Sequence, residues 1–245
     1  MVNFDSSIRL FVGLANNDDP STHRARECIV KAQALCPFAV TGAMVEGDGV
    51  ARARNNLAAM FLASNATHLL FQDADILPEP SDYTRLVSHG LPIVGGLYSK
   101  KQARLNWVAS SLDGETVNQQ SGLQRVSELG TGFLCIERGV FERMIEAHPE
   151  MRYTGDPSPD AVRWDFFPMG ARGGRYLSED WSFCERARAL GFDVWADWRC
   201  IVKHRGAINF PLHRTLTDDE LIDLIHNRTG RAPHDIAAFI RPVMP

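Results

Sequence analysis

Two aspartates, Asp73 and Asp75, follow the apolar residues 69–71 and Gln72 and come shortly before Pro78. Residues two apart on a strand point to the same side, so both carboxylates can present their oxygens together at a strand end. Such oxygens suit Mg²⁺ or Mn²⁺, which usually keep waters and complete their shell with substrate phosphates. The pair therefore indicates a metal site for a diphosphate-bearing substrate. A turn capped by aspartates before Pro78 is the structural alternative.

A second carboxylate pair, Glu179 and Asp180, opens a helix that we predict over residues 177–190. Ser178 can cap this helix, and acidic residues in a first turn complement the helix dipole, which would explain the pair without any chemistry. However, Asp180 shares one helical stripe with Phe183, Cys184 and Ala187. An inward carboxylate at a helix start, next to a long loop, is placed to act as a general base.

His204 follows the predicted strand 192–202, in which alternation puts every second residue from Val194 to Val202 on one face. A histidine on an apolar face is commonly a core residue with a satisfied hydrogen bond. Because His204 comes at a strand end, just before Arg205, a contact with a metal or a phosphate is the functional alternative. Neutral imidazole suits Mn²⁺ better than Mg²⁺.

Arg54 and Asn55 lie in the first turns of a helix that follows Gly49. The N-terminus of a helix attracts anions, and arginine can bind a phosphate with two parallel hydrogen bonds. A solvated helix face is the structural alternative. Gly130 and Gly132 precede an apolar strand and are too few for a dinucleotide fingerprint. Paired glycines there would let the backbone approach a ligand closely.

Strands and helices alternate in the first part of the chain, and these elements must position the candidate residues. Apolar periodicity predicts strands over 9–15, 38–45 and 67–71 and helices over 22–35 and 48–64. Helices of this length between strands imply crossover connections and a mostly parallel sheet, with ligands beyond the carboxyl ends of its strands. We therefore predict an α/β fold with a mostly parallel central sheet flanked by helices.

Later segments are shorter. We predict strands over 92–97, 106–112, 125–129 and 133–136, helices over 81–88 and 139–147, and a long loop over 155–174. A capping box from Thr217 to Glu220 predicts a helix in the tail. The expected organisation is a single domain over residues 1–210 with a C-terminal helical extension over 211–245 packed on it.

The composition narrows the class of protein. The chain has 245 residues, of which 44% are hydrophobic and 23% charged, as in an ordinary globular protein. A net charge of −4 gives no bulk attraction to nucleic acid. Five cysteines without a CxxC pair indicate reduced thiols. We see neither a secretory signal nor a transmembrane segment and expect a soluble, cytoplasmic protein.

Taken in order, these residues resemble the motifs of GT-A fold glycosyltransferases. The resemblance rests on five pieces: ARARN over 51–55, the DxD motif FQDADI over 71–76, GTGFL over 130–134 with Phe141, SEDWSFC over 178–184, and His204. It implies a Rossmann-like GT-A domain that is a metal-dependent glycosyltransferase. The donor would be a nucleoside-diphosphate sugar.

The resemblance also implies roles for individual residues. Asp73, Asp75 and His204 would hold Mn²⁺ or Mg²⁺ against the diphosphate, where the metal acts as a Lewis acid. Asp180 matches the base that deprotonates the acceptor hydroxyl in inverting members; in a retaining enzyme it would position a sugar hydroxyl instead. The remaining site residues divide between donor binding, by Arg54, Asn55, Asp73, Gly130 and Gly132, and acceptor binding, by Glu179 and Trp181.

Other functions remain open at this point. A nucleotidyltransferase would carry a glycine-rich basic loop after the first strand, which residues 16–20 lack. A non-catalytic nucleotide- or sugar-binding module and a metal-dependent hydrolase are further alternatives. For a glycosyltransferase, the acceptor could be a glycan, a lipid-linked sugar, a protein or a modified nucleobase. The sequence determines neither the donor nor the stereochemistry, although we favour inversion.

Overall fold

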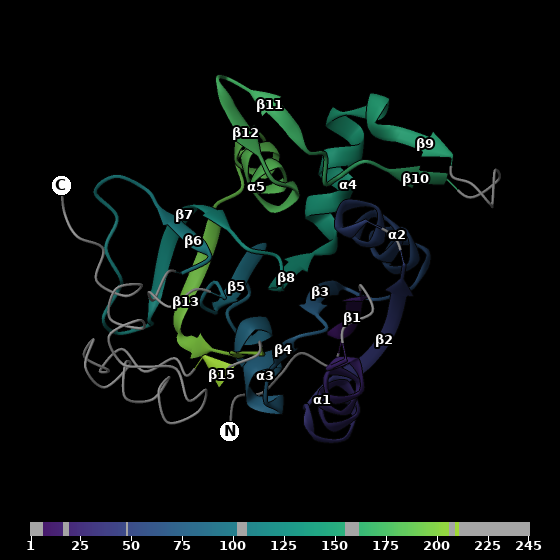
Figure 1. Ribbon diagram of the computed structural model, residues 1–245, viewed down its shortest axis with the longest axis vertical. Helices are drawn as coiled ribbons and strands as arrows, with labels where there is room; N and C mark the ends of the chain where they lie inside the picture. The colour runs from purple at the N-terminus through teal and green to yellow at the C-terminus, as the bar shows by residue number, and fades with distance from the viewer. Residues whose placement is uncertain are drawn as a thin grey trace, which may run out of the picture.

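The computed structural model describes residues 7–16, 20–47, 49–101, 107–154, 162–205 and 209–210. Eight strands form the central sheet in the order β2-β1-β3-β8-β5-β13-β7-β6 (Figure 1). Their bounds are β1 Arg9–Asn16, β2 Ala39–Glu46, β3 His68–Asp73, β5 Ile93–Leu97, β6 Ala109–Ser111, β7 Leu123–Leu129, β8 Phe133–Glu137 and β13 Val194–Ile201.

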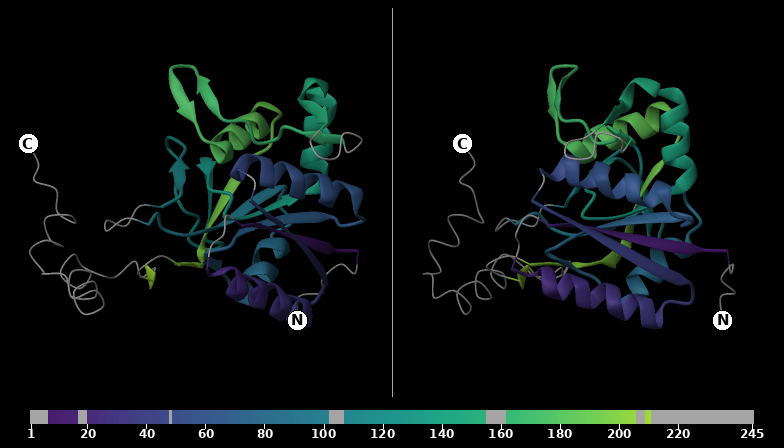
Figure 2. Two further views of the ribbon diagram at one scale, coloured as in Figure 1. Left: turned by 45° about the vertical axis from the view of Figure 1, so that its right-hand side comes forward. Right: turned by 90° about the vertical axis from the view of Figure 1, so that its right-hand side faces the viewer.

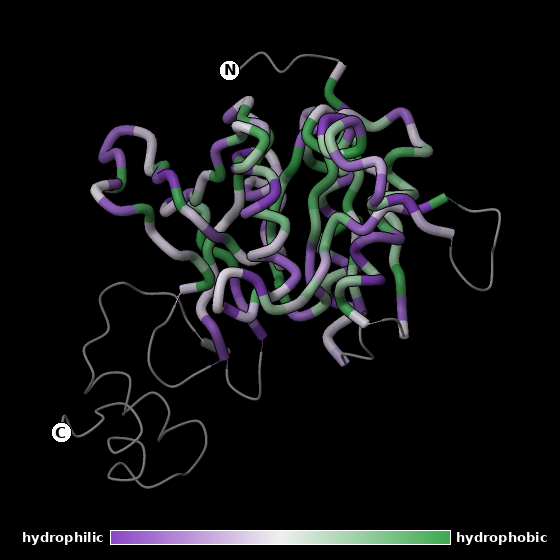
Figure 3. The backbone as a smooth tube through the Cα atoms, turned by 90° about the horizontal axis from the view of Figure 1, so that it is seen from above, coloured by the Kyte–Doolittle hydropathy of each residue, from purple (hydrophilic) through white to green (hydrophobic). Residues whose placement is uncertain are grey.

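Helices cover both faces of this sheet, and two hydrophobic clusters fill the space between (Figure 2). The helices α1 (Thr22–Leu35) and α3 (Pro80–Ser88) pack on one face. The helices α2 (Val50–Ala63), α4 (Arg138–Ala147) and α5 (Glu179–Ala189) pack on the other. Apolar residues follow the central strands (Figure 3). The prediction of an α/β fold with a helix-flanked sheet is confirmed.

The prediction of a mostly parallel sheet is wrong. β1 pairs in parallel with β2 and β3, and β5 with β13. The other four pairings, β3–β8, β5–β8, β7–β13 and β6–β7, are antiparallel. Parallel neighbours need long crossovers, which α1 and α2 supply in the first half of the chain. No helix lies between β5 and β8 in the described residues, so the sheet is mixed.

Short strands complete the edges of the fold. β4 (Ile76–Leu77), β14 (Lys203–Arg205) and β15 (Asn209–Phe210) form a three-stranded sheet. The hairpins β9 (Arg152–Thr154) with β10 (Val162–Trp164) and β11 (Gly170–Arg172) with β12 (Arg175–Leu177) lie beside α4 and α5 (Figure 1). The loop predicted over 155–174 thus contains β10 and β11. The predicted extension over 211–245 lies outside the described residues.

His204 does not lie at the end of the long strand that we predicted over residues 192–202. β13 ends at Ile201, and His204 sits in β14, where it pairs antiparallel with Ile76. A register shift between Asp197 and Ile201 also breaks the predicted alternation of β13. Asp197 lies before this shift and is fully buried (0% exposed), with its carboxylate against Arg85 and His89. Within the described residues, no helix is both long and apolar enough to cross a membrane.

Aromatic side chains fix α4 and α5 over the end of β3. Phe167 stacks on Phe183 of α5 at 4.9 Å and meets Phe71 of β3 edge-on at 5.3 Å. Phe141 of α4 meets Phe166 edge-on at 4.9 Å. Such pairs add about 0.5–1.5 kcal/mol each beyond their buried area. The start of α5, with its two carboxylates, is thereby held close to the strand that carries Asp73.

Replacing Asp197 by alanine is expected to lower the free energy of unfolding by about 3–5 kcal/mol. The carboxylate accepts hydrogen bonds from Arg85 (2.5 and 3.0 Å) and contacts His89 Nε2 at 2.8 Å. Burial alone would raise the pKa of Asp197, but His89 and Arg85 outweigh it and lower the pKa. The stabilisation is therefore full at neutral pH and declines as the pH falls below about 4.

Urea denaturation measures this effect. Asp193→Ala is the matched control, because Asp193 is exposed and its carboxylate lies 3.6 Å from Arg125. Exposed pairs contribute at most about 1 kcal/mol. Equal midpoints for the two variants would contradict the structural role of Asp197.

Candidate functional site

The centre of the site is Arg54, a buried guanidinium (3% exposed) in α2. It donates to Glu179 Oε1 at 2.6 Å and to Asp73 Oδ1 at 3.2 Å. Burial alone would lower the pKa of Arg54, but Asp73, Asp180 and Glu179 outweigh it and raise the pKa. One side chain thus joins the aspartate at the end of β3 to the acidic start of α5.

The two carboxylates bound to Arg54 respond to this burial. Desolvation raises the pKa of Asp73, and Arg54 offsets this only in part, since Asp75 and Asp180 add negative charge. Desolvation also raises the pKa of Glu179, with Asp180 as the next largest cause. Negative charge is therefore concentrated where β3 and α5 meet, and a cationic group would be favoured there.

Asp75 lies in the turn between β3 and β4 and has different partners. Its Oδ2 accepts a hydrogen bond from Lys101 Nζ at 2.5 Å and lies 3.3 Å from His204 Nε2. Burial would raise the pKa of Asp75, but His204 and Lys101 together outweigh it and lower the pKa. The backbone N–H of Arg205 donates to the Asp75 carbonyl at 2.7 Å, which ties β14 to this turn.

The orientation of His204 fits a metal ligand. Its Nδ1 lies 2.6 Å from the Ser99 carbonyl oxygen, which can only accept, so Nδ1 carries the proton. Nε2 is directed at Asp75 Oδ2, 3.3 Å away, and would supply a lone pair to a metal there once it carries no proton. Metal-ligating histidines usually donate their other ring N–H to such a partner. Asp75 and His204 therefore fit a divalent cation whose remaining positions are taken by phosphate and water.

Asp73, predicted as a metal ligand together with Asp75, has its carboxylate engaged by Arg54. Within the described residues, no group of three or more histidine, cysteine or acidic side chains is arranged to hold a metal. A metal at this site would thus take Asp75 and His204 from the protein and complete its shell with water or with oxygens of a ligand such as a diphosphate.

A cavity of about 490 Å³ lies next to this centre, at the start of α5. It brings together four residues predicted for the site, Gly130, Glu179, Asp180 and Trp181. Ser178 donates a hydrogen bond to Asp180 Oδ1 at 2.8 Å and so fixes that carboxylate. The cavity also has aromatic walls that the sequence analysis missed, formed by Trp107 and Tyr176.

Gly130 and Gly132 both lie against the side chain of Tyr98, which leaves no room for a Cβ at either position. The Tyr98 hydroxyl accepts a hydrogen bond from the Gly132 N–H at 2.8 Å. A Cβ on Gly132 would lie 2.5 Å from that hydroxyl oxygen and 2.8 Å from Asp73 Oδ2, and a Cβ on Gly130 would meet the same hydroxyl at 2.5 Å. The two glycines therefore admit Tyr98, which the sequence analysis missed, against Asp73.

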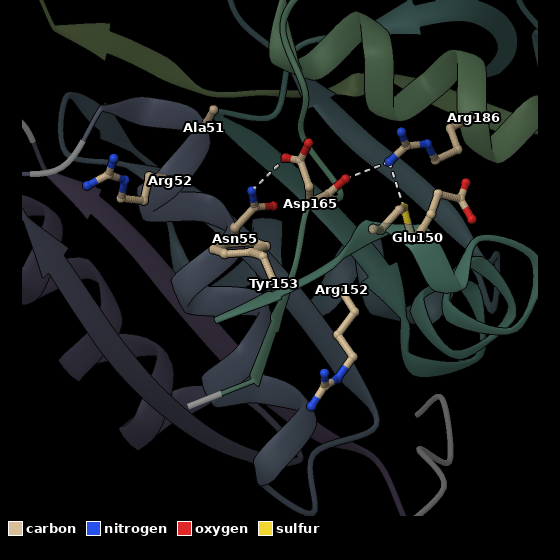
Figure 4. Close-up of a pocket in the computed structure, with 9 residues that line it drawn as sticks. Ala51, Arg52, Asn55, Glu150, Arg152, Tyr153, Asp165 and Arg186 are labelled. Carbon is tan, nitrogen blue, oxygen red and sulfur yellow. Dashed lines mark hydrogen bonds between the residues drawn. The ribbon is translucent and has the colours of Figure 1, made fainter. Parts of the chain in front are cut away.

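Asn55 lines a second cavity, away from the one at the start of α5. This second cavity, of about 590 Å³, lies between α2, β9 and α5 (Figure 4). Asn55 donates to Asp165 Oδ1 and accepts from the Phe166 N–H, both at 3.0 Å. Figure 4 shows Arg52 and Arg152 directed away from Asp165, so the basic residues around this cavity do not converge on one point. In the structure, Asn55 connects α2 to the segment after β10.

Comparisons with known proteins bear on the fold alone. No family model and no curated protein matches the sequence. Among solved structures, the crystal structure of A197 from STIV is similar, with a TM-score of 0.50 and 16% sequence identity. The similarity covers 81% of this chain and 86% of that chain.

Substituting Gly132 by alanine is expected to destabilise the fold by about 1–3 kcal/mol, because the new Cβ must displace Tyr98 or Asp73. Gly139→Ala is the matched control: a Cβ added there would have no neighbour within 4 Å, and alanine is favoured over glycine in helix α4. Thermal unfolding of both variants measures the difference. A Gly132→Ala protein as stable as the control would contradict the close packing of Tyr98.

Proposed function

We propose that this chain is a metal-dependent glycosyltransferase of the GT-A type, which transfers a sugar from a nucleoside-diphosphate sugar to an acceptor hydroxyl. The observation that carries the proposal is the double ion pair of Arg54 with Asp73 and Glu179. It brings the DxD motif and the start of α5 into one site, as a reaction between a metal-bound donor and an acceptor requires. The mixed α/β fold supports the proposal without being specific to it.

On the donor side, Asp75 and His204 would hold the metal, which supplies a Lewis acid for the leaving diphosphate. Arg54 fixes the carboxylate of Asp73 and leaves one donor, Nε, with no hydrogen-bond partner in the described part of the chain. Buried unsatisfied donors are rare in folded proteins. An anionic oxygen of the donor near Arg54 would satisfy Nε.

On the acceptor side, Asp180 is the proposed base. Its carboxylate lines the cavity beside Trp181, and Ser178 holds one of its oxygens, leaving the other for an acceptor hydroxyl. That hydroxyl oxygen would form a bond to the anomeric carbon as the bond from this carbon to the diphosphate breaks. The hydroxyl proton would pass to Asp180 and the configuration would be inverted.

The acceptor itself stays open among a glycan, a lipid-linked sugar, a protein and a modified nucleobase. We also infer a cytoplasmic location, since none of the five cysteines is paired.

Donor binding can be tested by thermal shift with nucleoside diphosphates, with and without Mn²⁺. A ligand at one hundred times its Kd stabilises the folded state by about 2.7 kcal/mol. We expect a Mn²⁺-dependent shift with one nucleotide, and its loss in Asp75→Ala. Asp113→Ala serves as a control with the same change of charge away from the site. A nucleotide shift that Asp75→Ala leaves unchanged would contradict the metal assignment.

Asp180→Asn should retain donor binding and lose transfer. Removing a general base costs about 10²–10⁴-fold in rate, while asparagine keeps the shape of the side chain and can still accept from Ser178. The measurement is release of nucleoside diphosphate from the donor sugar that shifts the melting point, with a panel of acceptors. Turnover equal to that of the original chain would exclude Asp180 as the base.

A further inference from the structure

We propose that Lys101 is a tethered competitor of the metal ion: its ammonium group occupies Asp75 in the metal-free chain and must leave before a divalent cation binds. The inference rests on the metal site of the proposed function and adds a residue that the resemblance to glycosyltransferases does not assign. It makes Lys101 a residue that sets the metal affinity of the site.

The contacts of one oxygen atom carry the argument. Lys101 Nζ and His204 Nε2 both approach Asp75 Oδ2, at 2.5 and 3.3 Å. A cation the size of Mg²⁺ binds a carboxylate oxygen at about 2.0–2.1 Å, so an ammonium group left in place would lie within about 5 Å of it. Like charges at this separation repel strongly in a partly buried site. Lysine and metal therefore exclude each other at Asp75.

The lysine is the partner that can move. His204 is held by the hydrogen bond to the Ser99 carbonyl and by edge-on contact of its ring with Tyr98 at 5.3 Å. Asp75 is 18% exposed, and its carbonyl is fixed by the Arg205 N–H. Lys101 is 42% exposed and has a long flexible side chain. Its ammonium group can leave Asp75 for solvent without disturbing either ligand.

Competition of this kind has a definite consequence for affinity. The metal-free site is divided between a closed form, with Lys101 on Asp75, and an open form that accepts metal. The apparent Kd for metal then exceeds the intrinsic Kd by the inverse of the open fraction. Partly exposed ion pairs contribute up to about 1 kcal/mol, which corresponds to a several-fold effect.

The adjacent Lys100 provides a matched control. It lines the cavity at the start of α5, where its Nζ lies 6.0 Å from the centre of the Trp181 ring. Lys100→Gln removes the same charge, one residue away, without touching Asp75. Any general gain in attraction for cations would affect both variants, whereas release of Asp75 belongs to Lys101→Gln alone.

The experiment titrates Mn²⁺ alone, with no nucleotide, into the full chain and follows free Mn²⁺ by electron paramagnetic resonance. We expect Lys101→Gln to bind Mn²⁺ about 3–5-fold more tightly than the original chain, the gain that loss of a pair of about 0.6–1 kcal/mol gives. Lys100→Gln should change the Kd less than twofold, and Asp75→Asn should abolish binding.

Three outcomes would overturn the proposal. Unchanged or weaker Mn²⁺ binding in Lys101→Gln would show that the lysine does not compete, and the metal site of the proposed function would stand. An equal gain in Lys100→Gln would reduce the effect to net charge. Absence of Mn²⁺ binding in both the original chain and Lys101→Gln would remove the nucleotide-free metal site on which this proposal rests, while the Mn²⁺-dependent nucleotide shift tests the proposed function separately.

Discussion

The burial of one arginine constrains the whole site. A guanidinium removed from water is costly unless it is paired and hydrogen-bonded, and Arg54 meets this demand only if β3 and α5 both bring a carboxylate to α2. Buried ion pairs of this kind add little net stability, but losing one partner leaves a charge uncompensated. The two ion pairs of Arg54 therefore require that the end of β3 and the start of α5 meet at α2.

The sequence predicted the residue types of the site better than their pairing. Asp73, Asp75, Glu179 and Asp180 were found because adjacent carboxylates at element ends are visible in a linear pattern. The ion pair of Arg54 with Glu179 spans 125 residues, and no spacing rule reaches that far. Tyr98 and Lys101 were missed since single residues carry no pattern, although both follow β5 at the strand edge where the aspartates follow β3.

Some features of the fold could likewise be predicted from the sequence, and others could not. The bounds of α1 agreed with the prediction because its apolar stripe, and the stop at Pro37, are local features. The direction of β8 could not be predicted, since the buried run Phe133–Glu137 fits a sheet equally well in either orientation. The buried position of Asp197 was not predicted because its partners Arg85 and His89 lie 112 and 108 residues away in the sequence.

The carboxylates of Asp73 and Asp75 in the DxD motif have different charged partners. This difference implies different roles for the two residues. Asp73 is paired with the buried Arg54, which offsets the effect of burial on the pKa of Asp73 only in part. Asp75 contacts a histidine and a partly exposed lysine, and under our proposal the lysine gives way to a divalent cation. Under the proposed function, exchange of cations would take place at Asp75, while the ion pair of Asp73 with Arg54 joins the end of β3 to α2.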